Sequence, residues 1–303
     1  MLTIAVDDIL PVHMADALTG EAPFWDAARG TLWWIDIQGQ RLLGFEPASG
    51  RTLMHRLPLM PGFVVSFAHH GLVLGLEDGI YAFDPATGVG DRLFAVEEDL
   101  PGNRLNDGKT DPAGRLWFGS MDKTGNGAPV GALYSLTPEG LLQRHRSEIR
   151  IPNAIAFSPC GKTFYFSDSR NQVVEAFDYD VTSGGFSNGR PFAIFTGDEH
   201  PDGACTDADG GVWIAVVNGS RVERRLPDGA LDAVVKLPVS RPTMPMLGGH
   251  DGQTLFVTSQ RRFLSTAKLK HETLAGQLLA ARLPFNGHGT GATTGSQAAR
   301  PQG

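Results

Sequence analysis

Residues 30–36 read GTLWWID, a turn glycine followed by a short run rich in aromatic and β-branched side chains. The same arrangement occurs five more times, after Gly71, Gly114, Gly161, Gly210 and Gly252. By subtraction, the intervals between the six glycines are 41, 43, 47, 49 and 42 residues. A period of this length is typical of β-propellers, in which each repeat forms one small sheet or blade. The sequence therefore predicts an all-β fold, a six-bladed β-propeller.

The segment before each turn glycine is expected to form the innermost strand of its blade and to line the central channel. Four of these segments carry a polar residue at a similar depth. Glu21 lies nine residues before its glycine, while Asn106, Asn153 and Asp202 each lie eight residues before theirs. Residues far apart in the sequence are therefore expected to meet at one mouth of the channel.

The domain organisation follows from the extent of the repeat. It runs without a break from residue 20 to residue 287, so we expect residues 1–286 to form a single propeller domain. Residues 287–303 contain almost nothing to bury and are predicted to be a disordered tail. Residues 4–12 alternate well enough to form a strand, which is expected to pair with the last blade and close the ring.

Composition limits the classes of partner. A net charge of −7 and a pI near 5.7 leave no basic face, so neither nucleic acid nor an anionic membrane surface is an expected partner. No segment reaches the roughly 18 apolar residues that span a bilayer, and the first residues do not resemble a secretory signal. Cys160 and Cys205 are expected to be small buried side chains rather than a disulfide. We expect a cytoplasmic protein, a monomer or a small homo-oligomer, with a small-molecule ligand.

The polar residues of the channel favour a metal site. Two carboxylates and an amide oxygen at one point would repel one another and resist desolvation unless a cation lay between them. Oxygen ligands from Glu21, Asn153 and Asp202 suit Ca²⁺, Mg²⁺ or Mn²⁺, and Zn²⁺ also accepts carboxylates. Three protein ligands leave positions for water and substrate, as in catalytic sites. The alternative is that Glu21 and Asp202 only cap turns or hydrogen-bond to strand ends.

Several motifs, spread over roughly residues 15–285, carry a family resemblance. They are GEAP at 20–23, NRLNDGK at 103–109, DPAGR at 111–115, GALY at 131–134, IPN at 151–153, AFDYD at 176–180 and PDG at 201–203. Together and in this order they resemble the regucalcin (SMP-30), gluconolactonase and luciferin-regenerating enzyme family. The chain departs from the family pattern at Ala22, where glycine or serine is usual, and residues 261–265 (RRFLS) resemble it only weakly.

The resemblance implies a six-bladed propeller with one divalent ion on the channel axis, held by Glu21, Asn153 and Asp202. It implies that Arg104 and Asn106 face the substrate. It also implies hydrolysis of a sugar lactone, such as a glucono-, xylono-, arabinono- or galactonolactone, to the aldonic acid. Members such as regucalcin have an acidic substrate-binding residue shortly after a Gly-Thr-Met stretch. The corresponding stretch is GSM at 119–121, and Asp122 is the nearest candidate.

The expected chemistry assigns a role to each residue. Asp202 is the best candidate to relay a proton from the attacking water to the ring oxygen, while Arg104 and Asn106 would hydrogen-bond to sugar hydroxyls or the carbonyl. Two alternatives stay open. One is a promiscuous metal-dependent esterase or lactonase of the same fold, favoured if Phe63 and Met244 form an apolar channel mouth. The other is a non-enzymatic calcium-binding propeller.

Overall fold

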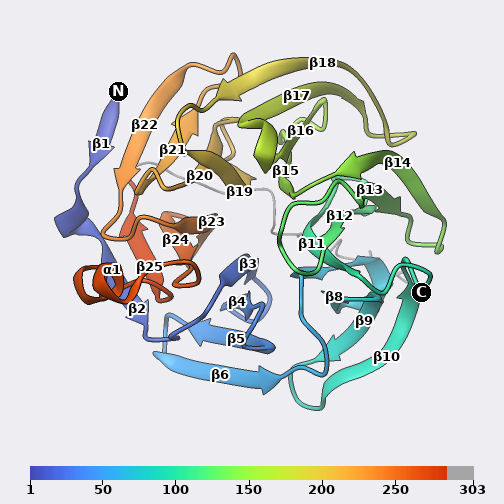
Figure 1. Ribbon diagram of the computed structural model, residues 1–303, viewed down its shortest axis with the longest axis horizontal. Coiled ribbons are helices and arrows are strands. Elements are labelled where there is room, and N and C mark those ends of the chain that lie inside the picture. The colour runs from blue at the N-terminus through green and yellow to red at the C-terminus, as the bar shows by residue number, and fades with distance from the viewer. Residues whose placement is uncertain (285–303) are drawn as a thin grey trace, which may run out of the picture.

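The computed structural model describes residues 1–284, so the predicted tail at 287–303 lies outside the described residues. Six sheets form a ring, which confirms the predicted six-bladed propeller (Figure 1). Each blade has four antiparallel strands, and blade 5 carries a fifth strand at its outer edge. The strands of blades 1 to 3 are β3 (Gly20–Asp26), β4 (Thr31–Asp36), β5 (Arg41–Glu46) and β6 (Arg51–Arg56); β7 (Phe63–Ser66), β8 (Leu72–Leu76), β9 (Gly79–Asp84) and β10 (Gly88–Ala95); and β11 (Asn103–Thr110), β12 (Leu116–Asp122), β13 (Gly131–Leu136) and β14 (Leu142–Ile149).

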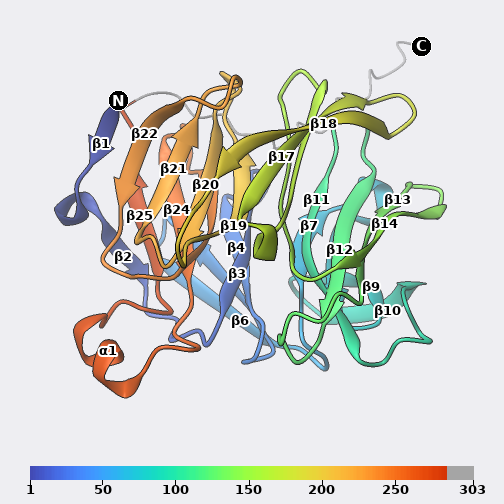
Figure 2. The same ribbon diagram turned by 45° about the horizontal axis from the view of Figure 1, so that its top comes forward.

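The second half of the chain repeats this plan. Its strands are β15 (Pro152–Phe157), β16 (Thr163–Asp168), β17 (Val173–Asp180) and β18 (Gly185–Ile194); β19 (His200–Thr206), β20 (Val212–Val217), β21 (Arg221–Arg225) and β22 (Leu231–Lys236); and β23 (Pro242–Gly248), β24 (Thr254–Ser259) and β25 (Leu278–Arg282). A short helix, α1 (Thr266–His271), lies between β24 and β25 and projects beyond the blades (Figure 2). Single 3-10 turns occupy Val6–Asp8, Ala68–His70 and Ser169–Asn171. No helix within residues 1–284 is long and apolar enough to cross a membrane.

The first strand of each blade lies at the centre of the ring. β3 contacts β7, β7 contacts β11, and the contacts continue through β15, β19 and β23 back to β3. These six strands are the segments that precede the turn glycines, so the predicted innermost position is confirmed. Large apolar side chains such as Trp33, Trp117 and Trp213, on the second strands, are fully buried in the cores around this centre.

The N-terminal segment closes the ring, but not as one strand. β2 (Leu10–His13) pairs antiparallel with β25 and supplies the fourth strand of blade 6, as expected. The prediction of a single strand over residues 4–12 is wrong, because the 3-10 turn at Val6–Asp8 interrupts it. The Asp8 carboxylate accepts a hydrogen bond from the backbone N–H of Ala5 at 3.3 Å, which favours this turn. The preceding β1 (Leu2–Ile4) instead joins blade 5, parallel to β22.

The two cysteines are both free, as expected for a protein without a disulfide. Cys205 is buried on β19, but Cys160 is exposed in the turn after β15. The expectation that both side chains are buried was therefore wrong for Cys160, because this turn lies outside the core of its blade.

Five of the six innermost strands carry a β-bulge at a similar depth. The pairing register shifts between Glu21 and Phe24, Leu105 and Gly108, Asn153 and Ala156, Pro201 and Ala204, and Pro242 and Pro245. The residues that follow Glu21 and Asn153 have positive φ angles, 45° at Ala22 and 53° at Ala154. Bulges of this kind re-aim side chains and are common beside active sites. The polar residues predicted from spacing all lie at these irregularities.

Close strand packing at this depth depends on small residues. A Cβ atom added at Gly62 would lie 2.6 Å from the backbone carbonyl carbon of Leu105. One added at Gly203 would lie 2.3 Å from the Met244 side chain. The glycines therefore let neighbouring innermost strands approach each other around the channel.

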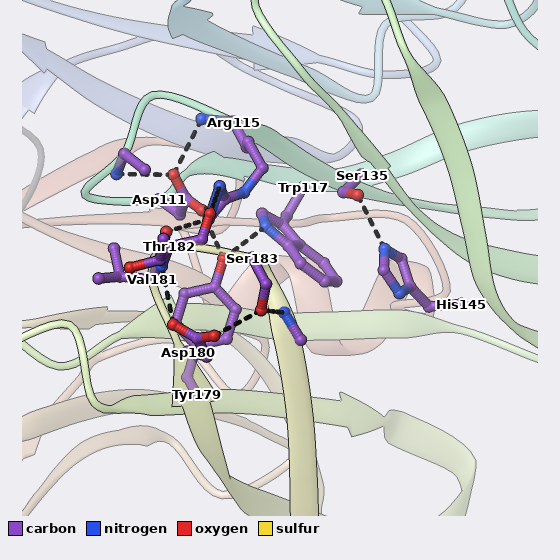
Figure 3. Close-up of polar contacts among 12 residues, drawn as sticks. Asp111, Arg115, Trp117, Ser135, His145, Tyr179, Asp180, Val181, Thr182 and Ser183 are labelled. Carbon is purple, nitrogen blue, oxygen red and sulfur yellow. Dashed lines mark hydrogen bonds and ion pairs between the residues drawn. The ribbon is translucent and has the colours of Figure 1, made fainter.

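A buried polar cluster joins blades 3 and 4 (Figure 3). The Asp111 carboxylate caps its own turn by accepting hydrogen bonds from the N–H groups of Ala113 and Arg115 at 2.8 and 2.9 Å. Its second oxygen pairs with Arg115 Nε at 3.0 Å and accepts the hydroxyl of Tyr179 from blade 4. Trp117 Nε1 donates to the same hydroxyl at 3.1 Å. Asp111 therefore holds a turn and an interface between blades at once.

We expect Asp111→Ala to lower the free energy of unfolding by about 3 kcal/mol, because it leaves a buried guanidinium without its carboxylate. Chemical denaturation measures this loss. The matched control is Asp178→Ala, which removes an exposed carboxylate of blade 4 from its pair with Arg190 and should change stability little. Equal stability of the two variants would show that the cluster does not stabilise the interface.

Candidate active site

A cavity of about 320 Å³ opens at one mouth of the central channel. Five of the six residues singled out from the sequence line it: Glu21, Arg104, Asn106, Asn153 and Asp202. They come from four different blades, on β3, β11, β15 and β19. The similar depth of Glu21, Asn106, Asn153 and Asp202 in the repeat is therefore matched by convergence in space.

Burial disfavours the charged form of both carboxylates in the cavity. Burial raises the pKa of Glu21 well above its usual value, and the charge of Asp202 raises it further. Burial and the charge of Asp107 raise the pKa of Asp202 to about 7. Glu21 Oε2 also accepts a hydrogen bond from the N–H of Ala22 at 2.8 Å. An excess of negative charge on hard oxygen atoms is the environment that a divalent cation stabilises.

A directed chain of hydrogen bonds orients the amides beside them. Arg104 Nη1 donates to Asn106 Oδ1 at 2.8 Å, and Asn106 Nδ2 donates to Asn153 Oδ1 at 2.9 Å. Asn153 Nδ2 donates to Ser169 Oγ at 2.9 Å, whose hydroxyl donates to the carbonyl of Pro201 at 2.6 Å. Because a guanidinium can only donate, Arg104 fixes the direction of the whole chain.

This orientation leaves Asn153 suitable as a ligand. Its Oδ1 accepts one hydrogen bond and has a second lone pair free for a cation. Within residues 1–284 no cluster of three or more His, Cys, Asp or Glu side chains is arranged to hold a metal. A metal centre in the cavity therefore needs the Asn153 amide as well as Glu21 and Asp202, and this donor set of oxygen atoms fits a hard ion.

Asp122, the sixth residue predicted from the sequence, is not brought into the cavity wall. Its carboxylate accepts hydrogen bonds from the N–H groups of Thr124 and Asn126, both at 3.1 Å, and from the Thr124 hydroxyl at 2.5 Å. The hydrogen bonds from Thr124 lower the pKa of Asp122. This side chain holds the loop after β12, and it interacts with Arg104 only through its charge.

The expected apolar mouth around Phe63 and Met244 is also absent from the cavity wall. Both side chains are almost fully buried, at 0% and 1% exposure. Phe63 lies against the backbone of Gly108, and Met244 lies against that of Gly203. The expectation was wrong because these side chains pack between neighbouring innermost strands, where glycines leave space for them.

Sequence reasoning missed other lining residues. His200 and Arg241 each precede by one residue a segment that was correctly assigned as an innermost strand, so extending those segments would have found them. Arg170, Gln260, Arg262 and Phe263 come from connections between the second and third strands of blades 4 and 6. These connections differ in length from blade to blade, so the repeat gives them no common register.

Comparison with known proteins agrees with this fold. A family model described as SMP-30/Gluconolactonase/LRE-like region matches residues 19–261. The chain belongs to the SMP-30/gluconolactonase/LRE-like family. The resemblance of its motifs to this family is therefore confirmed, and the matched region ends one residue before Arg262.

Two relatives in this family match most of the chain. Regucalcin of Xenopus laevis is 36% identical over 246 residues, which span 79% of this chain and 82% of that protein. The 6-deoxy-6-sulfogluconolactonase of Pseudomonas putida is 34% identical over 277 residues, 89% of this chain and 93% of that protein. Among solved structures, a calcium-binding protein, regucalcin, from Agrobacterium tumefaciens aligns with a TM-score of 0.87 at 30% identity. The alignment covers 95% of this chain and 98% of the regucalcin chain.

Proposed function

We propose that this protein hydrolyses a sugar lactone to the aldonic acid and that one divalent ion, bound by Glu21, Asn153 and Asp202, is required. The observation that carries the proposal is the convergence of two carboxylates and an oriented amide oxygen on one cavity. Support also comes from the family, in which a relative 34% identical is named as a lactonase and another protein is described as calcium-binding. The ion is Ca²⁺, Mg²⁺, Mn²⁺ or Zn²⁺.

When bound, such an ion supplies Lewis acidity toward the lactone carbonyl and makes an attacking water more acidic. The protein residues do the remaining work. Water attacks the carbonyl carbon, the bond from that carbon to the ring oxygen breaks, and Asp202 carries the proton from the water to the ring oxygen. The aldonic acid then leaves with its new hydroxyl group.

Arg104 and Asn106 bind and orient the substrate in this proposal. Arg104 uses Nη1 for the backbone oxygen of Leu105 and for Asn106 Oδ1, so its remaining N–H groups are available to a hydroxyl or carbonyl oxygen. The side chains are only 6% and 9% exposed, so their polar groups favour a ligand that hydrogen-bonds in return. Sugar lactones meet this requirement better than apolar ones.

A lactone panel with metal-loaded protein tests the proposal. We expect kcat/KM for aldonolactones to exceed that for an apolar lactone of the same ring size by at least tenfold, because each unpaired buried donor costs about 1–3 kcal/mol. Equal rates for both lactones and for an aryl ester would favour the promiscuous hydrolase. Binding of the ion without turnover of any lactone would favour the non-enzymatic calcium-binding protein.

A further inference from the structure

Four arginine side chains line the cavity without an acidic partner. Arg104, Arg170, Arg241 and Arg262 all contribute to its wall. Within residues 1–284, no carboxylate oxygen lies within 4.0 Å of a guanidinium nitrogen of these four residues, so none of them forms a salt bridge. Most other arginines of the described chain do pair with a carboxylate, including Arg261 beside Arg262. Arg104 and Arg241 donate hydrogen bonds only to neutral oxygen atoms, such as Asn106 Oδ1 and Asn218 Oδ1, both at 2.8 Å. Guanidinium groups that gather at one cavity without a carboxylate partner are typical of sites that bind an anion.

Arg262 reaches across the mouth from blade 6 toward blade 3. Its two terminal nitrogens lie 3.9 and 4.0 Å from where a Cβ atom of Gly125 would be. Its guanidinium also lies 4.5 Å from the ring centre of Phe263, and that of Arg241 lies 5.6 Å from the same ring. The Phe263 ring therefore makes cation–π contacts with two of the four guanidinium groups, those of Arg241 and Arg262.

Arg170 approaches the same loop of blade 3 from blade 4. Its Nε lies 3.1 Å from where a Cβ atom of Gly127 would be. Gly125 and Gly127 have positive φ angles of 77° and 76°, so the loop requires a residue such as glycine at both positions. Because these glycines have no side chains, the guanidinium group of Arg262 fits beside Gly125 and that of Arg170 fits beside Gly127.

These charges repel one another when no anion is present. Burial lowers the pKa of Arg104 to about 10, and the positive charge of Arg262 contributes to that lowering. Glu21, Glu77 and Asp122 oppose this lowering at Arg104, and Asp202, Glu272 and Asp198 act in the same sense at Arg241. They act from beyond salt-bridge distance, and under the proposed function the charges of Glu21 and Asp202 are balanced by the divalent ion. No carboxylate of the described residues pairs directly with these four guanidinium groups, so an anionic ligand can supply that direct contact.

We propose that the preferred lactone carries an anionic substituent, a carboxylate, sulfonate or phosphate, which Arg262 binds together with Arg241 and Arg170. This inference rests on the proposed lactonase function and names its substrate class. The carbonyl end of the substrate lies beside Glu21, Asn153 and Asp202 under the proposed function, so the anionic end faces Arg170, Arg241 and Arg262. The carboxylate formed by hydrolysis belongs to the carbonyl end and does not reach this rim.

The test compares two lactones that differ only in charge, glucono-1,5-lactone and 6-phosphoglucono-1,5-lactone, with full-length, metal-loaded protein. We expect wild-type kcat/KM to favour the phosphorylated lactone by at least tenfold. Arg262→Ala should lower kcat/KM for the phosphorylated lactone at least tenfold more than for the neutral one. Raising the salt concentration from 50 to 500 mM should reduce the wild-type preference, because salt screens the attraction at the open rim.

Two further variants and a binding measurement distinguish loss of the anion site from a general loss of charge, of folding or of turnover. Arg282→Ala removes an exposed arginine paired with Asp251 on blade 6, and it should leave the ratio of the two kcat/KM values unchanged. Arg262→Gln repeats the test with a smaller change of shape if the alanine variant folds poorly. Calorimetry with 6-phosphogluconate measures the anion site without turnover.

Equal use of both lactones, with both rates lowered alike by Arg262→Ala, would overturn the anionic substrate while leaving the lactonase function intact. Binding of 6-phosphogluconate that is lost in Arg262→Ala, without hydrolysis of either lactone, would support the anion site and contradict the lactonase function. Absence of both binding and hydrolysis would overturn both proposals.

Discussion

Asp202→Ala is expected to abolish lactone turnover and to remove tight binding of the divalent ion. The substitution deletes one of only two carboxylates among the three proposed ligands, and it deletes the group that would carry the proton to the ring oxygen. We expect kcat to fall by at least a thousandfold, equivalent to about 4 kcal/mol in the activation free energy. Calorimetric titration with the ion and initial-rate kinetics measure the two losses separately.

The matched control for this variant is Asp178→Ala, which removes an exposed aspartate on the outer part of blade 4. It should retain both the affinity for the ion and the turnover number of the wild type. A second variant, Glu21→Gln, should also weaken ion binding while keeping the size of the side chain. Wild-type affinity for the ion in Asp202→Ala would show that the ligand assignment is wrong.

Arg104→Met is expected to lower kcat/KM for aldonolactones about a hundredfold. The methionine keeps much of the buried volume but removes the donors proposed to bind the substrate, and it removes the hydrogen bond that orients Asn106. Affinity for the ion should fall by less than tenfold, because Ser169 still accepts from Asn153 Nδ2 and holds that amide. Steady-state kinetics and ion titration on the same preparation check the two expectations.

The comparison of substrates makes the Arg104 prediction specific. An apolar lactone of the same ring size lacks the hydroxyl groups that Arg104 would bind, so its kcat/KM should fall much less than that of an aldonolactone. If the ion affinity of Arg104→Met dropped as far as that of Asp202→Ala, Arg104 would act through the metal centre and not as a substrate contact.

The repeat in the sequence was sufficient to predict the blades and the convergence of their polar residues. Turn glycines mark each blade, and each innermost strand precedes its glycine, so depth in the channel can be counted from fixed points. The count works for Asn106, Asn153 and Asp202 because their strands carry bulges at a similar depth. Ala22 replaces the residue usual in the family, yet its φ of 45° resembles that of Ala154. The departure therefore leaves the local turn intact.

The remaining features depend on contacts that spacing does not encode. Asp122 was placed by its position after residues 119–121, but the loop that follows turns back and occupies its carboxylate with Thr124 and Asn126. Phe63 and Met244 lie on the expected innermost strands, but their side chains pack between neighbouring strands and do not line the channel mouth. Arg262 lies in a connection of unique length that crosses to blade 3, which only the closed ring brings near.

The central claim is that one divalent ion at the mouth of the channel makes the protein a sugar lactonase. Its most direct test is to strip the wild-type protein of metal, titrate it with a divalent ion by calorimetry, and measure hydrolysis of an aldonolactone at each point of the titration. We predict one tightly bound ion per chain and a rate that rises in proportion to its occupancy from almost zero. Full lactone turnover by the metal-free protein, or complete occupancy without any turnover, would contradict the claim.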